Sequence, residues 1–320
     1  MESVHRGAVV VVDAAGAVVA ASGDPDLRSF ARSAIKPLQA LPLAADGAVE
    51  RFALTLSELA VVCGSHSGEG VHLAAVRAIL EKIGLEEGSL HCGGHFPFHA
   101  QTAETMRARG EAPRPIHDNC SGKHAGMLAL ARLHGWDPDS YMAPDHPAQA
   151  RIREAIAALT GTPAATALSA IDGCGVPTYH IALRELATAF ARLGMAAALD
   201  APWGEAAQLV TSAMMRFPEM VAGTGRLDTA LMKVASGRLF TKSGGEAIGA
   251  VGVPGRGLGL ALKIEDGTPR AAGPVVIEAL RQLEVLTEEE VRTLAPFHHP
   301  PVLNRRGVQV GEITPAFTLR

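Results

Sequence analysis

Lysine is rare in this chain, although basic residues are not. Of the 29 Lys and Arg residues, six are lysines and 23 are arginines. Arginine keeps its proton in proteins, whereas a lysine in a suitable pocket can lose it and act as a base or a metal ligand. Three of the six lysines, Lys36, Lys123 and Lys242, stand beside Ser or Cys. An Arg-rich genome would also leave some lysines by chance, so the neighbouring residues must show whether each lysine has a functional role.

Other features are scarce as well, and each absence excludes a class of function. Aromatic residues make up 4% of the chain, which leaves no stacking platform for nucleic-acid bases. The net charge is −4 without a basic run, so neither nucleic acid nor membrane is an expected partner. No apolar stretch has the length of a membrane span, and the run at 8–12 is too short for a signal peptide. We therefore expect a cytoplasmic protein.

What is present indicates a globular protein, with 48% hydrophobic and 19% charged residues. The β-rich runs at 8–13 and 17–21 flank a short turn and predict a hairpin. Closely spaced glycines after residue 236 indicate antiparallel strands, with a last strand near 308–313. Apolar residues at helical spacing predict helices at 33–43, 71–83, 124–134, 147–159, 179–193, 205–216, 274–286 and 288–294.

Strands at both ends of the chain with helices between them predict an α+β fold class. We expect a single domain, 1–320, in two parts. A sheet part comprises roughly residues 1–65 and 220–320, and a helical lobe comprises roughly residues 66–219. A cleft between the lobe and the sheet is the expected place for a ligand.

Ser33 and Lys36 form a Ser-x-x-Lys pattern. On a helix, positions i and i+3 lie on one face, so the hydroxyl and the amine would meet. A neutral lysine accepts the serine proton and makes the oxygen a stronger nucleophile. The pattern is short and also occurs by chance, so it needs support from other segments.

Two further segments supply that support. Ser65 lies in a Gly-flanked Ser-His-Ser loop, and Lys242 opens Lys-Ser-Gly. Ser-x-x-Lys, then Ser-x-polar, then Lys-Ser/Thr-Gly is the order found in penicillin-binding proteins and class A β-lactamases, which are serine acyl-transfer enzymes. Ser67 departs from this pattern, because Asn is usual there. A structural alternative is that the Ser-His-Ser loop caps the helix expected from residue 71.

Cys120 and Cys174 lie in separate loops and would together hold a soft or borderline divalent ion such as zinc. The third ligand would be His124, His117 or a neutral Lys123. His124 opens a helix, where a histidine is commonly a cap or a surface residue.

A rival metal set is Cys92 with His95 and His99, although its spacing matches no familiar zinc module. In a cytosolic chain, the four cysteines are expected to be thiols or ligands and not disulfides. They would equally serve as small buried packing residues.

Longer strings of the sequence resemble a known family, the L-asparaginase II family of the Rhizobium etli type. The resemblance covers about residues 5–315, and every motif position holds the expected residue type. The strings that carry it lie at 5–7, 9–11, 32–40, 63–69, 119–127, 172–177, 223–226 and 240–246.

The resemblance implies a fold like that of glutaminases and serine β-lactamases, a homodimer, and hydrolysis of L-asparagine to L-aspartate and ammonia. It also implies two Ser-Lys tandems that face one cavity, Ser33 with Lys36 and Ser65 with Lys242. The inducible member of the family binds zinc through Cys, Lys and Cys, which fall on Cys120, Lys123 and Cys174 of this sequence.

These roles together predict a Ser-Lys acyl-enzyme mechanism. Lys36 would activate Ser33 for attack on the side-chain amide carbon. Ser65 and Lys242 would relay a proton to the leaving ammonia and then activate water, and loop N–H groups near Ser33 or Gly244 would stabilise the oxyanion.

The resemblance implies that Asp172 is a pocket residue, which would pair with the α-ammonium group of the substrate. Arg32 or His124 would bind its α-carboxylate. A glutaminase of the same fold is one alternative, because a single methylene separates the two substrates. A non-catalytic metal-binding protein is another, in which only the cysteines would matter.

Overall fold

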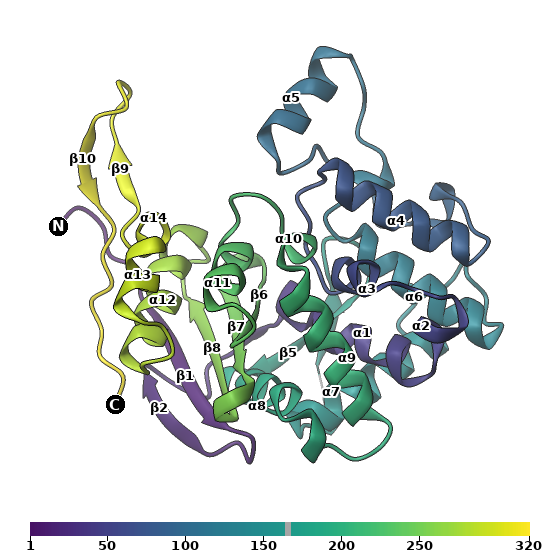
Figure 1. Ribbon diagram of the computed structural model, residues 1–320, viewed down its shortest axis with the longest axis horizontal. Coiled ribbons are helices and arrows are strands. Elements are labelled where there is room, and N and C mark those ends of the chain that lie inside the picture. The colour runs from purple at the N-terminus through teal and green to yellow at the C-terminus, as the bar shows by residue number, and fades with distance from the viewer. Residues whose placement is uncertain (164–167) are drawn as a thin grey trace.

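The computed structural model describes residues 1–163 and 168–320, and its centre is a five-stranded antiparallel sheet in the order β2-β1-β8-β7-β6 (Figure 1). Val10 of β1 lies opposite Ala21 of β2 on one side and Ala261 of β8 on the other. The chain's first strand is therefore interior to the sheet. The five strands are β1 (Gly7–Asp13), β2 (Val18–Ser22), β6 (Phe240–Ser243), β7 (Ile248–Val253) and β8 (Leu258–Ile264).

Helix α8 (Leu183–Gly194) packs against this sheet and contacts β1, β7 and β8. The contact is close because β8 carries glycine at the crossing. A Cβ built on Gly259 would lie 1.9 Å from the backbone oxygen of Ala187. Helix α12 (Ala272–Gln282) also packs against β8. Val9 to Val12 of β1 are fully or almost fully buried, as in a strand covered on both faces.

The helical lobe lies to the right of the sheet in Figure 1. Its centre is α1 (Lys36–Ala45), which packs against α6, α7 and α9. The other helices of the lobe are α2 (Ala48–Arg51), α3 (Leu56–Val62), α4 (Gly70–Lys82), α5 (Ala100–Ala108), α6 (Ser121–His134), α7 (Pro147–Thr160), α9 (Trp203–Arg216) and α10 (Pro218–Val221).

The remaining elements join or flank these two parts. A small sheet has the order β3-β5-β4. A hairpin of β9 and β10 projects from the C-terminal end at the upper left of Figure 1. These elements are β3 (Arg28–Phe30), β4 (Ser169–Ile171), β5 (Pro177–Ala182), α11 (Leu227–Ala235), α13 (Glu288–Thr293), α14 (Ala295–His298), β9 (Pro301–Leu303) and β10 (Gln309–Glu312).

The α+β class and a sheet built from both ends of the chain are confirmed. The expected helix at 179–193 is wrong in its first turn, because residues up to Ala182 belong to β5. Tyr179 pairs with β4, Ile181 pairs with β3, and both side chains are buried. Aromatic and β-branched side chains favour such strand positions. The helix begins only at Leu183, where the Glu185 side chain accepts a hydrogen bond from the Ala182 N–H at 2.7 Å.

The packing crosses the boundaries expected for the two parts. Helices α1 and α3 lie before residue 66 but pack with α6 and α9 of the lobe, whereas α8 lies inside 66–219 but covers the sheet. Within the described residues, no helix has the length and apolar character that crossing a membrane requires.

Candidate active site

A cavity of about 400 Å³ opens at the junction of the sheet and the lobe. Its walls come from the end of β6 on one side and from loops of the lobe on the other. It is lined by Arg32, Ser33, Ser65, His95, Phe98, Asp118, Asn119, Cys120, Asp172, Gly173, Cys174, Arg226, Ser243, Gly244 and Gly245. The cavity therefore gathers segments that are more than 200 residues apart in the sequence.

Ser33 enters this cavity from a sharp turn. It belongs to a 3₁₀ helix, Arg32–Ile35, that leads directly into α1. Arg32 has φ +48°, a left-handed conformation that costs a non-glycine residue about 1–3 kcal/mol and is concentrated at functional sites. The Arg32 N–H is held by Thr178 Oγ1 at 3.0 Å, so the strained residue is tied to β5.

The Gly244–Gly245 segment passes closely over the same turn. A Cβ on Gly244 would lie 3.1 Å from both the Ala34 nitrogen and the Ala31 oxygen, and 2.6 Å from Cγ2 of Ile248. Only glycine therefore lets the end of β6 approach the Ser33 turn. Ser33 and Gly245 both line the cavity, so their backbone N–H groups are candidates for an oxyanion hole.

Lys36 is fully buried, and its amine contacts Ser65. Nζ lies 2.9 Å from Ser65 Oγ, 2.6 Å from the Gly64 carbonyl oxygen and 3.4 Å from the Asn119 carbonyl oxygen. A neutral amine would donate to the two carbonyls and accept the Ser65 proton, whereas an ammonium would donate to all three. A proton can thus pass between Lys36 and Ser65 without movement of the heavy atoms.

The hydrogen bond of Lys36 differs from the one that Ser-x-x-Lys predicts. The pattern pairs Lys36 with Ser33, but the structure joins it to Ser65. In the described part of the chain, the Ser33 hydroxyl has no hydrogen-bond partner, and Ser33 lines the cavity. The reason is that the Gly64 and Asn119 carbonyls draw the amine of Lys36 towards the Ser65 loop.

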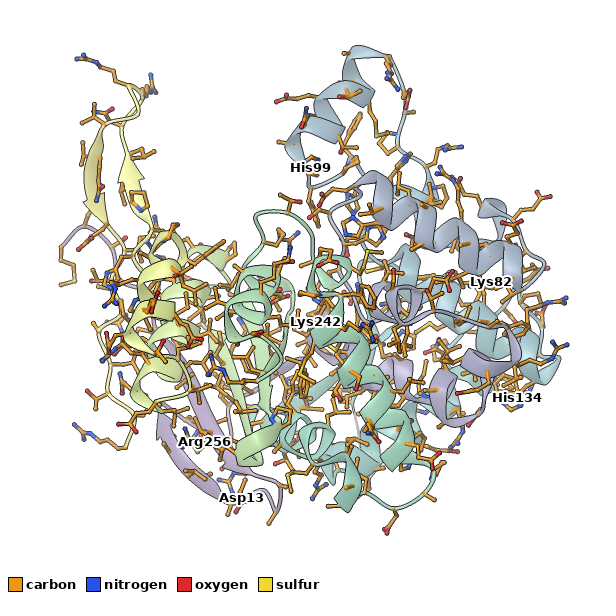
Figure 2. The ribbon with its side chains drawn as sticks, in the orientation of Figure 1. Asp13, Lys82, His99, His134, Lys242 and Arg256 are labelled. Atoms are coloured by element: carbon orange, nitrogen blue, oxygen red, sulfur yellow. The ribbon has the colours of Figure 1, made fainter. Side chains whose placement is uncertain are left out.

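Lys242 lies in β6 at the centre of the molecule (Figure 2) and is fully buried. Burial lowers the pKa of Lys242 to about 7, against the opposing effect of Asp228, and the charges of Lys36 and Arg226 add to the lowering. Nζ lies 3.8 Å from Asp228 Oδ2 and donates to the Ser243 carbonyl oxygen at 2.5 Å. A pKa near neutrality suits a general base that works close to pH 7.

The residues predicted to bind the charged groups of the substrate occupy different environments. Arg32 Nε donates to Asp172 Oδ1 at 2.6 Å, and both residues line the cavity. Burial raises the pKa of Asp172, but the charge of Lys123, the Gly173 N–H and Arg32 outweigh it and lower the pKa overall. His124 does not line the cavity. It is fully buried, its Nδ1 lies 2.6 Å from the Tyr141 hydroxyl, and burial lowers its pKa to about 3.

Cys120, Lys123 and Cys174 meet at the wall of the cavity. Cys120 precedes α6, Lys123 lies in its first turn, and Cys174 lies in the turn between β4 and β5. Lys123 Nζ donates to Cys174 Sγ at 3.1 Å. The neighbouring Cys120 and the charge of Lys123 outweigh burial and lower the pKa of Cys174 to about 5. Burial would lower the pKa of Lys123, but the two cysteines outweigh it and raise the pKa.

This set of donors fits a soft divalent metal. It offers two sulfur atoms and one amine, all nearly or fully buried. In residues 1–163 and 168–320, no group of three or more His, Cys, Asp or Glu side chains is placed to hold a metal ion. A metal at Cys120 and Cys174 would have Lys123 Nζ, 3.1 Å from Cys174 Sγ, as a third protein ligand, and Lys123 would have to release its proton to bind it.

The other proposed ligands have separate partners. His117 Nδ1 accepts from the Arg114 N–H at 2.9 Å. Cys92 Sγ donates to the Pro115 carbonyl, His95 Nε2 accepts from the Asn119 N–H, and His99 Nδ1 lies 2.7 Å from Thr102 Oγ1. All four cysteines are free thiols.

Sequence reasoning missed two charged residues of the site, Arg226 and Asp228. Arg226 lines the cavity. Asp228 is buried, and its Oδ2 accepts hydrogen bonds from Ser243 N at 3.0 Å and Ser243 Oγ at 2.7 Å. The signal was the turn Gly223-Thr224-Gly225, which places both charges at the start of α11.

Comparison with known proteins places these residues in a family. The family model described as L-asparaginase II matches residues 1–315. A search of curated protein sequences finds no match.

Two solved structures match this chain at low sequence identity and low TM-score. A β-lactamase from Mycobacterium bovis is 18% identical, with a TM-score of 0.47, over 88% of this chain and 95% of that one. A structure described as Mglu is 15% identical, with a TM-score of 0.39, over 88% of this chain and 67% of that one. At these values neither similarity bears on activity.

Proposed function

Because the chain belongs to the L-asparaginase II family, a family of asparaginase-type hydrolases, we propose that it hydrolyses L-asparagine to L-aspartate and ammonia. The observation that carries the proposal is the contact of buried Lys36 with Ser65 in the wall of a cavity that also holds Ser33. A serine hydroxyl beside a buried amine is what covalent acyl transfer needs.

In the proposed mechanism, Ser33 Oγ attacks the side-chain amide carbon. A carbon–oxygen bond forms, and the Ser33 proton passes to Lys36 through Ser65. The negative charge on the amide oxygen is stabilised by the N–H groups of Ser33 and Gly245. The carbon–nitrogen bond then breaks as the amide nitrogen receives that proton from Lys36 through Ser65, and ammonia leaves an aspartyl ester on Ser33.

The second half of the reaction hydrolyses that ester. Lys242, whose pKa is near 7, accepts a proton from water as the water oxygen attacks the ester carbon. The bond to Ser33 Oγ breaks, Ser33 regains the proton that Lys242 took from water, and aspartate leaves. Catalytic roles thus fall on Ser33, Lys36, Ser65 and Lys242, and Asp172 receives the α-ammonium group of the substrate.

A zinc ion is part of the proposal as a group that shapes the site. Cys120, Lys123 and Cys174 would hold it, and it would supply a fixed positive charge at the wall of the cavity. The protein's own residues supply the nucleophile and the bases. The proposal also includes a homodimer, as the family resemblance implies, and a cytoplasmic location, as expected from the sequence.

Ammonia release from L-asparagine and L-glutamine tests the activity, and ring opening of a β-lactam, which releases no ammonia, is followed separately by absorbance. Turnover of asparagine above the other two is expected, whereas preference for glutamine would indicate a glutaminase. No turnover of any of them, with zinc retained, would indicate a non-catalytic metal-binding protein.

Mass spectrometry of the acid-quenched enzyme with asparagine tests the covalent step. An aspartyl adduct is expected on the peptide that contains Ser33. An adduct on the Ser65 peptide would exchange the roles of the two serines within the same mechanism.

A further inference from the structure

Two arginines line the cavity, and they differ in what neutralises their charge. Arg32 is paired with Asp172. Arg226 has no ion pair with any carboxylate of the described residues. Its guanidinium lies 5.4 Å from the ring centre of Phe98, and Nη1 lies 3.4 Å from Ser67 Oγ. An arginine kept half-buried without a carboxylate has donors free for a bound anion.

The position of Arg226 is fixed relative to the Ser65 loop. The turn before it is held by Glu69, which accepts hydrogen bonds from the Thr224 N–H and hydroxyl, both at 2.8 Å. A Cβ on Gly223 would lie 2.5 Å from Glu69 Oε1 and 2.7 Å from Ser67 Oγ, so the two loops are in close contact. Arg226 therefore presents its charge at a defined place beside Ser65.

Asp172 provides the opposite charge in the same cavity. Its Oδ1 is used by Arg32 and the Gly173 N–H, and its Oδ2 accepts no hydrogen bond from the described residues. The cavity thus has a free carboxylate oxygen at Asp172, a free guanidinium at Arg226, and both serines in its walls. A molecule with an ammonium group, a carboxylate and an amide matches all three features.

We propose that Arg226 binds the α-carboxylate of the substrate, so that the site selects amides of free α-amino acids. This assignment rests on the proposed function, because it specifies how the same cavity holds asparagine. It replaces His124, which lies outside the cavity, and Arg32, whose Nε is already engaged by Asp172.

The test compares Arg226→Gln with wild type on L-asparagine and on L-asparagine methyl ester, which lacks the α-carboxylate charge. Loss of a charge-assisted hydrogen bond lowers kcat/KM for asparagine by about 10- to 100-fold. The methyl ester has no α-carboxylate charge for Arg226 to bind, so its kcat/KM should fall by no more than about threefold. The preference for asparagine over the ester therefore disappears. Because Arg226 also lowers the pKa of Lys242, its loss slows both substrates alike, and only their ratio isolates carboxylate binding.

The matched control is Arg216→Gln. Arg216 also lies over a phenylalanine ring, 5.9 Å from the centre of Phe217, but it does not line the cavity. The preference of the Arg216→Gln variant for asparagine over the methyl ester should equal that of wild type. If Arg226→Gln fails to fold, Arg226→Lys keeps the charge without the planar fork and should show part of the same loss. An unchanged preference in a folded Arg226 variant would overturn the assignment.

A binding measurement separates this assignment from the proposed function. Calorimetry compares aspartate with its α-amide, isoasparagine, in wild type and Arg226→Gln. Tighter binding of aspartate that Arg226→Gln abolishes supports the carboxylate site even if asparagine is not hydrolysed. Equal binding of both compounds to wild type, or binding of neither, refutes it.

Discussion

At the scale of single residues, the site depends on two lysines whose surroundings differ. Lys36 touches two backbone carbonyls and Ser65, whereas Lys242 has a buried carboxylate, Asp228, at 3.8 Å. The pKa of Lys242 is nevertheless low, because loss of hydration on burial outweighs a partner at that distance. An arginine at either position would keep its charge, which explains why lysine is retained there in an Arg-rich chain.

Lys36→Arg should lower kcat/KM by at least about 10²-fold, because arginine cannot accept the Ser65 proton. Lys233→Arg is the matched control, since Lys233 is a largely exposed surface lysine with a distant acidic neighbour. Ammonia release from both variants, with circular dichroism to confirm folding, measures the effect. Activity of Lys36→Arg within a few-fold of wild type would exclude a proton-accepting role for Lys36.

The pH profile should report on Lys242. A base must be deprotonated to act, so activity should rise with pH through a midpoint near the Lys242 pKa of about 7. Asp228 raises that pKa, so Asp228→Asn should move the midpoint to lower pH. Asp228 also holds Ser243, and a purely structural role would lower the rate without moving the midpoint.

At the scale of elements, the candidate site forms where three segments that are distant in the sequence meet. The 3₁₀ turn, the loop after α3 and the end of β6 each carry one part of the Ser-Lys machinery. The closest of these approaches depends on Gly244, which has no side chain to separate β6 from the Ser33 turn.

Gly244→Ala should lower kcat by about 10²-fold or more, because a Cβ would push the oxyanion N–H groups out of place. Gly255→Ala is its control, since a Cβ there meets nothing within 4 Å. Steady-state kinetics on both proteins, with thermal melts, would show the difference. Equal kcat values for the two variants would remove the Gly244 segment from the oxyanion site.

The proposed metal ligands also come from two elements, the start of α6 and the β4–β5 turn. Cys120→Ser and Cys174→Ser should purify with little zinc, because each removes one of two thiolate donors. Cys63→Ser and Cys92→Ser should keep it, since neither is a proposed ligand and the Cys92 thiol already donates to the Pro115 carbonyl. Metal analysis of the four proteins decides the matter, and full zinc content in both Cys120→Ser and Cys174→Ser would refute the assignment.

For the individual elements, the sequence predicted the positions of helices more accurately than the contacts between residues that are distant in the chain. Helical spacing located α4, α6, α7, α9 and α12 to within a few residues, because these helices have continuous apolar faces. It missed β5, whose role depends on partners distant in the chain. The same limit applies to the site: motifs identified Ser33, Lys36, Ser65 and Lys242, but spacing could not predict that Lys36 would turn to Ser65 or that His124 would be buried.

At the scale of the whole molecule, the cavity joins the sheet to the helical lobe. Ser243 and Gly244 come from the sheet, whereas Ser65, Cys120 and Asn119 come from the lobe. Lys242 lies at the centre of the molecule in Figure 2, between these parts. A ligand in this cavity therefore contacts both parts at once and should stabilise them as one unit.

Aspartate should raise the melting temperature of the whole protein in a single transition. At about 100 times its Kd, a ligand that binds only the folded state adds about 2.7 kcal/mol to the free energy of unfolding. Ser33→Ala should show a similar shift, because it removes the nucleophile and leaves Asp172 and Arg226 in place. Differential scanning calorimetry tests this with isoasparagine as the comparison ligand. A melt that splits into two transitions, with aspartate shifting only one, would mean that the sheet and the lobe do not share the bound ligand.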